Sequence, residues 1–456
     1  RIAATAGGGS EPGLADPSGH NDGADLGRAA GCGDEAGATG RQALRGSGRP
    51  PMIVHVIKAA GLAGAERHLL TLLPGLATAG FAVRLIVLSE PNRPIDELVR
   101  TFQGQRVAIE QWPIRRDVDP LLLAALIRRL QALAPAILHT HLVHADLYGA
   151  WATRVMGALG PLRAGSRWSR PLLVSTRHDQ LAFRRRWWMR RLHRAQWQWL
   201  SAGICVSEAL AAFCIDVEGA PRSRIETIPH GLRYPDPDRE EARTRLGLRS
   251  DEIAVGMAGR LVPEKGFDLG IEAFAAVAHA HPAARLVILG DGPERAALEL
   301  RAERHSILSA GGDSGAVSGA REPGGRARQA WAGRVRWLGW RSDAEELLAG
   351  LDLLVAPSRS EGFGLVLLEA MAQGVPVLAT EVDAIPEIVT DHREGRLVPP
   401  NDAEVLARAL DELMADAAVR ARMGSHARTR ARGSFTADQM VQRTAALYGR
   451  LLEGTR

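Results

Sequence analysis

From residue 52 onward, the sequence alternates between short apolar runs typical of buried strands and longer stretches with the apolar periodicity of helices. Strand-like runs lie at 52–57, 83–88, 136–140, 172–176 and 203–207, and again at 253–258, 285–289, 335–338, 352–356 and 375–379. Helical patterns lie at 66–76, 120–133, 144–158, 185–200 and 207–217. Strands that alternate with helices form parallel sheets covered by helices on both faces. We therefore predict an α/β protein made of Rossmann-like, doubly wound sheets.

Two domains are expected, because a chain of 456 residues with 46% hydrophobic content is long enough for two cores. The segment 234–238, rich in Pro and Asp, interrupts the pattern between the two groups of strands. We place an N-terminal domain at 51–232 and a C-terminal domain at 233–435. Residues 1–50 and an insertion at about 305–330 lack a periodic apolar pattern, and we expect a disordered extension and a flexible loop there.

Charge and cysteine content point away from several classes of protein. The net charge of +5 is spread along the chain, whereas a nucleic-acid-binding protein gathers its charge on one face, so we expect no nucleic-acid partner. The three cysteines, Cys32, Cys205 and Cys214, lack the spacing of metal ligands and are too few for a disulfide framework. No apolar run reaches 18 residues and no secretory signal pattern is seen, so we expect a cytoplasmic protein.

The segment 360–372 carries the chemistry of a sugar-nucleotide site. It follows a strand-like run and reads as a glycine turn that opens an apolar helix, with Glu361 in the turn and Glu369 in the helix. Free backbone N–H groups at a helix start attract anions, and Gly362 and Gly364 allow a diphosphate to approach the main chain. Eight residues of helix span roughly 12 Å, so the two carboxylates are expected to bind the hydroxyls of the two sugars on either side of a diphosphate.

This segment resembles the E-x7-E signature of the retaining glycosyltransferases of family 4, including Phe363 between the glycines and the Leu-Leu-Glu-Ala-Met run. The resemblance implies the GT-B fold, in which two facing Rossmann-like domains enclose a cleft and the final helix, here about 436–456, crosses back to the N-terminal domain. It also implies retention of anomeric configuration, no bound metal and no cofactor beyond the nucleotide-sugar donor. Phe363 and Leu365 are assigned to donor binding, together with Glu361, Gly362, Gly364 and Glu369.

Other turns of the second half resemble the same family. Arg260 and Lys265 lie in a Gly-Arg-Leu-x-x-x-Lys-Gly turn that follows the strand at 253–258, and basic side chains there suit a diphosphate leaving group. The family's basic residues at this element contact the donor diphosphate. Gly290 and Gly292, in Gly-Asp-Gly-Pro, match a turn that lines the family's nucleotide pocket. Donor binding is therefore expected from Arg260, Lys265, Gly290 and Gly292.

On the acceptor side, Gly61, Gly64 and Glu66 are similar to the family's glycine loop and G-x-E element. Ala63 stands where a second adjacent glycine is common, which puts the mobility of this loop in question. His178 falls where the family places a histidine near the acceptor hydroxyl and the donor sugar, so it is our first catalytic candidate with Glu361, Arg260 and Lys265. His141, at the end of an earlier strand, is assigned to acceptor binding.

The stretch 184–199 carries six arginines, four tryptophans and no acid. Such a helix suits an anionic membrane surface, and a lipid-linked acceptor would explain it. The alternative is an amphipathic helix whose tryptophans pack on the sheet, and the sequence does not separate the two. The first interpretation would place the protein at the inner face of the membrane.

The sequence predicts a retaining, metal-independent glycosyltransferase that moves a hexose from a nucleoside diphosphate sugar, such as a UDP-sugar or GDP-mannose, to a saccharide or lipid-linked acceptor in polysaccharide biosynthesis. Two alternatives stay open. A sugar-nucleotide epimerase shares the two-domain layout but lacks the long glutamate signature. A non-catalytic, membrane-associated glycan-assembly protein would keep the fold without an intact set of site residues.

Overall fold

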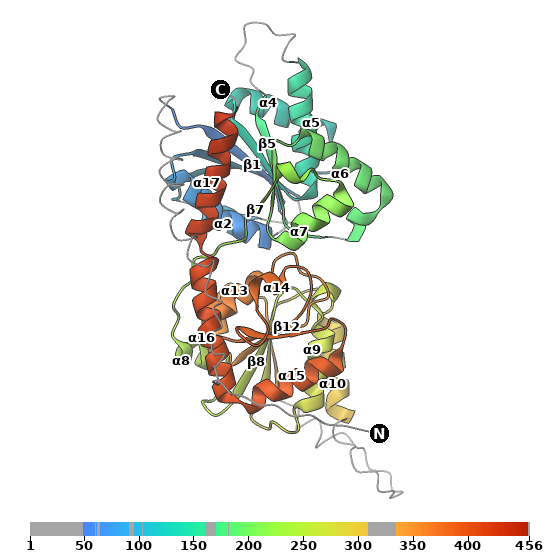
Figure 1. Ribbon diagram of the computed structural model, residues 1–456, viewed down its shortest axis with the longest axis vertical. Coiled ribbons are helices and arrows are strands. Elements are labelled where there is room, and N and C mark those ends of the chain that lie inside the picture. The colour runs from blue at the N-terminus through green and yellow to red at the C-terminus, as the bar shows by residue number, and fades with distance from the viewer. Residues whose placement is uncertain are drawn as a thin grey trace, which may run out of the picture.

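The computed structural model shows two α/β domains stacked along the long axis of the molecule (Figure 1). It describes residues 49–59, 61, 64–90, 95–102, 104–159, 170–180, 182–308 and 334–454. The expected extension at 1–50 lies almost wholly outside this range, as does most of the expected insertion at 305–330.

The N-terminal domain is built on a seven-stranded parallel sheet in the order β3-β2-β1-β4-β5-β6-β7. Its strands are β1 (Met52–Ala59), β2 (Ala82–Ser89), β3 (Val107–Pro113), β4 (Ile137–His141), β5 (Leu172–Arg177), β6 (Ala202–Cys205) and β7 (Ile225–Thr227). Its α-helices are α2 (Gly64–Thr78), α3 (Asp96–Thr101), α4 (Pro120–Leu133), α5 (Leu142–Leu159), α6 (Trp187–Trp199) and α7 (Glu208–Phe213). The central strands read as continuous apolar runs because helices cover both faces.

The C-terminal domain repeats this design with a six-stranded parallel sheet in the order β10-β9-β8-β11-β12-β13. Its strands are β8 (Ile253–Ala258), β9 (Ala284–Leu289), β10 (Val335–Gly339), β11 (Leu353–Ala356), β12 (Val377–Thr380) and β13 (Gly395–Val398). Its helices are α8 (Arg239–Arg245), α9 (Phe267–Val277), α10 (Arg295–Leu308), α12 (Ala344–Leu347), α13 (Leu365–Ala372), α14 (Ile385–Ile388), α15 (Ala403–Ala415) and α16 (Ala417–Ser434). The predicted fold class of two Rossmann-like domains is confirmed.

In both sheets the strand order reverses beside the first strand, between β1 and β4 and between β8 and β11. Ligands of open α/β sheets bind at such a switch point, outside the carboxyl ends of the strands. The turns after β1, β4, β5, β8 and β11 are therefore the places where a site is to be sought.

The last helix, α17 (Ala437–Glu453), returns to the N-terminal domain and packs on α2 (Figure 1). Its side chains Met440, Val441, Leu447 and Tyr448 belong to the same buried cluster as Leu69 and Leu73 of α2 and the strands β1 and β2. A capping box at Thr436 and Gln439 fixes where the helix begins. The structure thus places the C-terminal helix as the sequence predicts.

Several elements do not stand out in the sequence. The edge strand β3 mixes Glu110 and Gln111 with apolar residues, and β7 and β13 have only three and four residues. Such short or edge strands carry little of the apolar run that marks a buried strand. Among the described residues, no helix has the length and apolar character needed to cross a membrane.

Candidate active site

The turn at 357–364, between β11 and α13, carries residues that the sequence assigns to donor binding, and we call it the donor turn for that reason. Gly364 has φ +98°, in the left-handed region, and directly precedes the first residue of α13. The amides of Ser360 and Arg359 are held by the Glu264 carbonyl, and Asp383 Oδ2 accepts hydrogen bonds from the Glu361 amide and the Ser360 hydroxyl, both at 2.8 Å. This network fixes the turn ahead of the helix start.

Glu361 lies before the helix rather than in it, so the estimate of roughly 12 Å for eight helical residues does not apply here. The helix begins only at Leu365, because Gly364, directly before it, has a left-handed conformation. Glu361 forms an ion pair with Lys265, and the Ser358 hydroxyl lies 3.4 Å from the same carboxylate oxygen. Two residues predicted to be catalytic therefore meet directly.

The turn after β8 presents its two basic residues differently. Arg260 is exposed, and no acidic partner is seen for it among the described residues, while Lys265 is mostly covered and paired with Glu361. Gly290, with φ +145°, lies against the Gly259 carbonyl, and a Cβ there would come within 1.8 Å of that oxygen. A Cβ on Gly292 would come within 2.4 Å of the Leu261 carbonyl. These glycines are required by the close packing of neighbouring turns.

Glu369 is buried in α13 and faces the other domain. Its carboxylate forms an ion pair of 2.7 Å with Arg67 of α2, and Arg67 also lies 3.4 Å from Glu345 of α12. Burial raises the pKa of the Glu369 carboxyl, and the Arg67 charge opposes that rise. Burial and the neighbouring Glu369 raise the pKa of Glu345 to about 7. One arginine of the N-terminal domain thus bridges two carboxyls of the C-terminal domain.

The two domains touch where the predicted catalytic residues lie. A Cβ on Gly362 would stand 2.2 Å from the backbone carbonyl of His178, which follows β5, so these two main chains are in close contact. Leu365 contacts the start of α2 at Gly64, and the rings of Phe363 and His230 lie 5.0 Å apart. Glu387 accepts hydrogen bonds from the amides of Glu208 and Ala209 at the start of α7. The donor turn and His178 therefore face each other.

On the N-terminal side, His141 is fully buried at the end of β4 and lies behind His178. Its Nδ1 is 3.2 Å from His178 Nε2 and its Nε2 is 3.0 Å from His55 Nδ1. The structure therefore connects His141 to the site through His178. Glu66 is buried at the start of α2, and Gly61 lies just after β1, whereas Ala63 is outside the described residues.

Sequence reasoning missed several residues that the fold brings to this junction. His68 and His230 join the histidines already named, Arg67 and Glu345 flank Glu369, Asp383 holds the donor turn and Tyr448 arrives on α17. Arg67 and His68 directly follow Glu66, a predicted site residue. Their position on the first turns of α2 could therefore have identified them as site residues. Nothing local marks Glu345 or Tyr448.

The paired doubly wound sheets, with a glycine turn and basic residues facing a histidine across the junction, define the GT-B class of fold. The model of the family described as "Glycosyltransferase Family 4" matches residues 62–233, and that described as "Glycosyl transferases group 1" matches residues 252–416. The chain belongs to the group 1, family 4 glycosyltransferases, which confirms the resemblance seen in the sequence.

Individual relatives agree with this membership. The chain is 33% identical over 199 residues to the lipopolysaccharide core biosynthesis glycosyltransferase LpsE of Rhizobium meliloti, covering 44% of this chain and 50% of LpsE. It is 32% identical over 248 residues to the D-inositol 3-phosphate glycosyltransferase of Mycobacterium marinum, covering 52% of this chain and 47% of that enzyme. The chain thus spans about half the length of these curated relatives.

Solved structures show the same fold. The structure of HepE from Anabaena in complex with UDP and glucose superposes with a TM-score of 0.69 at 21% identity, over 87% of this chain and 98% of HepE. WaaG, a glycosyltransferase involved in lipopolysaccharide biosynthesis, superposes with a TM-score of 0.58 at 19% identity, over 87% of this chain and 98% of WaaG.

Proposed function

We propose that this protein transfers a hexose from a nucleoside diphosphate sugar to a saccharide or lipid-linked acceptor, with retention of anomeric configuration and without a metal. The observation that carries this proposal is the Lys265–Glu361 ion pair next to Gly362, whose main chain lies against the backbone of His178 across the domain junction. Lys265 can offer a cation to a leaving diphosphate and Glu361 a carboxylate to a sugar hydroxyl. Both lie at the junction where His178, the candidate on the acceptor side, is found.

The donor diphosphate would bind between the start of α13 and the turn after β8. Backbone N–H groups at Gly364 and beyond offer hydrogen bonds, and Arg260 and Lys265 supply positive charge. In the structure the Lys265 ammonium neutralises the Glu361 carboxylate. A bound diphosphate would share that ammonium, and the Glu361 carboxylate would then be available to orient the transferred sugar. These interactions grow stronger as charge develops on the leaving oxygen, so they favour the transition state.

The chemical step is a front-face substitution. The bond from the anomeric carbon to the diphosphate oxygen breaks, and the acceptor oxygen bonds to the same face of that carbon. The departing diphosphate oxygen takes the proton from the acceptor hydroxyl, so no separate base is required. His178 would lie beside this face and position the acceptor hydroxyl and the donor sugar.

Glu369 is proposed to bind the ribose hydroxyls of the donor. In the structure this carboxylate is paired with Arg67, so donor binding would exchange one partner of Glu369 for another. A nucleotide that competes with Arg67 for Glu369 would weaken this contact between the domains. Donor binding would then change the relative position of the two domains.

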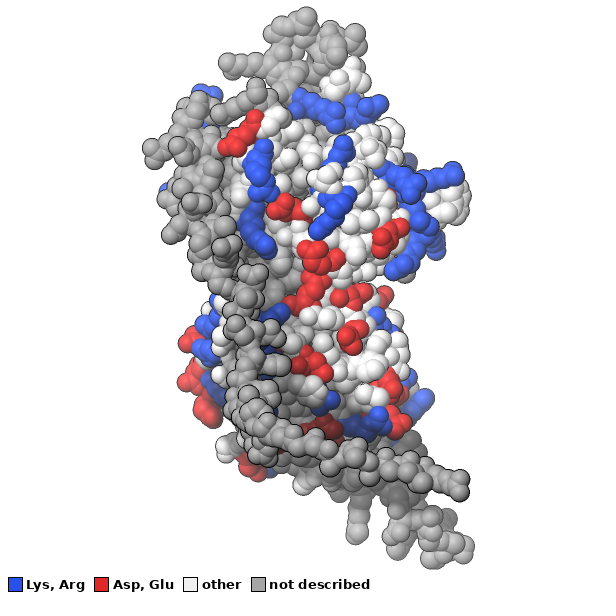
Figure 2. Space-filling model, in the orientation of Figure 1, with Lys and Arg blue, Asp and Glu red and all other residues white. Residues whose placement is uncertain are grey.

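A membrane surface is proposed as a further partner through α6. The helix buries Met189, His193, Gln196 and Trp197, whereas Trp187 and Trp188 are 70% and 47% exposed. Arg184, which the sequence groups with this stretch, is instead fully buried and bonded to Glu218 at 3.1 Å. The packing alternative applies to Trp197, and the exposed face is where we propose the membrane contact. Figure 2 shows basic residues on the flank of the N-terminal domain where α6 lies. Exposed rings beside arginines suit anionic headgroups.

The donor proposal is tested by calorimetry with UDP, GDP, ADP and their hexose conjugates against the purified chain and Glu369→Ala. Binding of one nucleotide that the variant weakens supports the site and identifies the base. No binding by any nucleotide would favour a non-catalytic assembly protein. With a donor identified, the anomeric configuration of the first product, read by NMR, decides between retention and inversion, and activity in excess EDTA tests metal independence.

The membrane proposal has a separate test, in which the chain is sedimented with anionic vesicles at low salt. Trp187→Ser combined with Trp188→Ser is expected to weaken binding, while Trp340→Ser, which removes an exposed tryptophan of the C-terminal domain, serves as the matched control. Equal binding of both variants would rule out α6 as the contact surface.

A further inference from the structure

Six histidines gather at the carboxyl end of the N-terminal sheet, and five of them are at most 5% exposed. They are His55 on β1, His68 on α2, His139 and His141 on β4, His178 after β5 and His230 after β7, of which His178 alone is half-buried. The donor-sugar chemistry proposed above uses only His178. A buried imidazole needs partners for its polar nitrogens, so the remaining histidines require an explanation.

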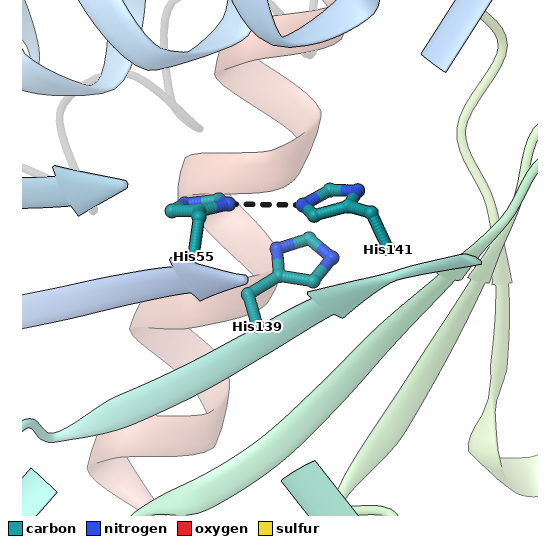
Figure 3. Close-up of side chains that lie close together, drawn as sticks. All are labelled: His55, His139 and His141. Atoms are coloured by element: carbon teal, nitrogen blue, oxygen red, sulfur yellow. Dashed lines mark hydrogen bonds between the residues drawn. The ribbon is translucent and has the colours of Figure 1, made fainter. Parts of the chain in front are cut away.

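One subset, His55, His139 and His141, also has ring nitrogens within 4.8 Å of one another, but hydrogen bonds already engage most of them, and Figure 3 shows the one between His55 and His141. The rings of His139 and His141 are stacked at 29° with centroids 4.3 Å apart, and those of His55 and His141 are stacked at 16°. Both nitrogens of His139 already have partners, the Tyr448 hydroxyl at 2.5 Å and the Thr176 hydroxyl at 2.7 Å. This subset is a hydrogen-bonded core in which, among the described residues, His55 Nε2 alone lacks a partner.

A second subset, His68, His141 and His178, has the geometry of a metal site. The ring planes are splayed at 38° to 69°, and the ring centroids are 5.2, 5.5 and 6.0 Å apart. Three imidazoles bound to one tetrahedral zinc at about 2.0 Å have centroids roughly 5 Å apart and nitrogens roughly 3.3 Å apart. His141 Nδ1 and His178 Nε2 are already 3.2 Å apart, and a His68 nitrogen lies within 4.8 Å of both.

One ligand atom of the set is unused. His68 Nε2, the nitrogen that does not face His230, is shielded from solvent and has no hydrogen-bond partner among the described residues. Neighbouring histidines hold the outer nitrogens of two members, because His230 Nδ1 lies 2.8 Å from His68 Nδ1 and His55 Nδ1 lies 3.0 Å from His141 Nε2, whereas the outer nitrogen of His178, Nδ1, has no such partner. Metal-bound histidines are usually fixed by such a second hydrogen bond, which orients the ring.

Neutral imidazole is the form that binds a metal, and this environment favours it. Burial lowers the pKa of His68 to about 3 and holds the pKa values of His141 and His178 well below the ordinary value.

We propose that His68, His141 and His178 form a binding site for a divalent transition metal that accepts imidazole ligands, such as Zn²⁺, Co²⁺ or Ni²⁺. The fourth position opens where half-buried His178 faces the donor turn. If the transferase proposed above is correct, metal at this site would inhibit transfer, because it would occupy the lone pair of the residue that positions the acceptor. The metal site itself does not depend on that function.

Metal binding is measured on the full chain after treatment with EDTA and buffer exchange. Calorimetry is expected to show one Zn²⁺ per chain, and Co²⁺ is expected to give the intense visible absorption of a tetrahedral site. His68→Gln and His178→Gln should each weaken binding by about 100-fold, or about 2.7 kcal/mol. His392→Gln, at an exposed histidine of the C-terminal domain, is the matched control and should bind like the original chain.

Each outcome decides the proposal. Binding that survives both His68→Gln and His178→Gln, or that His392→Gln removes, would assign the metal to another place in the chain and overturn the site. No binding by the unaltered chain would overturn it as well. Thermal unfolding of each variant without metal shows whether it folds, and a Zn²⁺-dependent rise in Tm that is lost in a folded variant supports the site. Failure of the transferase would leave these binding results unaffected.

Discussion

The two sheets share one strand order but present different chemistry at their carboxyl ends. The C-terminal sheet ends in glycine turns whose backbones lie so close that Gly290 and Gly292 leave no room for a Cβ. The N-terminal sheet ends in buried imidazoles that contact one another. A backbone surface suits the diphosphate common to all nucleotide sugars, whereas a side-chain surface can differ between acceptors.

The two ends also differ in charge. The C-terminal side of the junction carries Lys265, Arg260 and Glu361, whereas on the N-terminal side burial lowers the pKa values of His141 and His178. Arg67 supplies positive charge from the N-terminal domain to the buried carboxyls of the other. Four substitutions test how far this contrast determines activity and stability.

The largest effect is expected from Lys265→Ala, which removes the cation beside Glu361 on the donor side. We expect kcat/KM to fall by about a thousandfold, about 4 kcal/mol of transition-state stabilisation, since charge develops on the departing diphosphate. Steady-state kinetics with the identified donor measures it. The matched control is Lys58→Ala, because Lys58 is the only other lysine and pairs with Glu90 at 3.1 Å. Similar losses in both variants would contradict a specific role for Lys265.

The next effect concerns pH and the carboxyls bridged by Arg67. Because the pKa of Glu345 is raised to about 7 in the folded state, the folded protein binds more protons than the unfolded chain from about pH 4.5 to 7. This group's contribution to stability is therefore fully present below about pH 4.5 and is lost as pH rises to about 7. The loss is up to about 3 kcal/mol.

Glu345→Gln should remove that dependence. Urea unfolding of the original chain and the variant at several pH values gives the difference in free energy of unfolding, which should grow from pH 4.5 to 7 and stay level above 7. Glu404→Gln, at a surface carboxyl paired with Arg408, is the control and should show no such trend. A constant difference for Glu345→Gln would mean that its carboxyl titrates normally.

The sequence predicted the parts of this molecule that depend on local order. The strand, glycine turn and helix around Glu361 appear in one continuous segment, and the apolar runs of the central strands reflect burial on both faces. The contacts that complete the site join residues far apart in the chain. Arg67 meets Glu369 only because the two domains pack together, and His139 meets Tyr448 only because α17 packs back on the N-terminal domain. No local pattern encodes such pairs.

A smaller effect is expected at the domain junction from Gly362→Ala. The added Cβ would lie 2.2 Å from the His178 carbonyl, so the domains would have to separate by some tenths of an ångström or more, at a cost of about 1–3 kcal/mol. A lower kcat/KM and a lower Tm should follow. Gly64→Ala is the control for Tm at the same junction, because its nearest neighbour, Leu365 Cδ1, would be 3.6 Å away; kcat/KM is not compared, since Gly64 is itself assigned to acceptor binding. Equal effects of the two substitutions would indicate that Gly362 does not set the junction.

The smallest effect is expected from Tyr448→Phe, which separates the packing of α17 from its hydrogen bond. The ring packs against Phe81 with centroids 5.7 Å apart, and its hydroxyl bonds His139 Nδ1. Phenylalanine keeps the packing but leaves one buried imidazole nitrogen without a partner, so the free energy of unfolding should fall by about 1–2 kcal/mol. Urea unfolding measures this. Because His139 is not among the proposed metal ligands, Zn²⁺ affinity should stay unchanged, and a large loss of affinity would show that the two histidine subsets act as one.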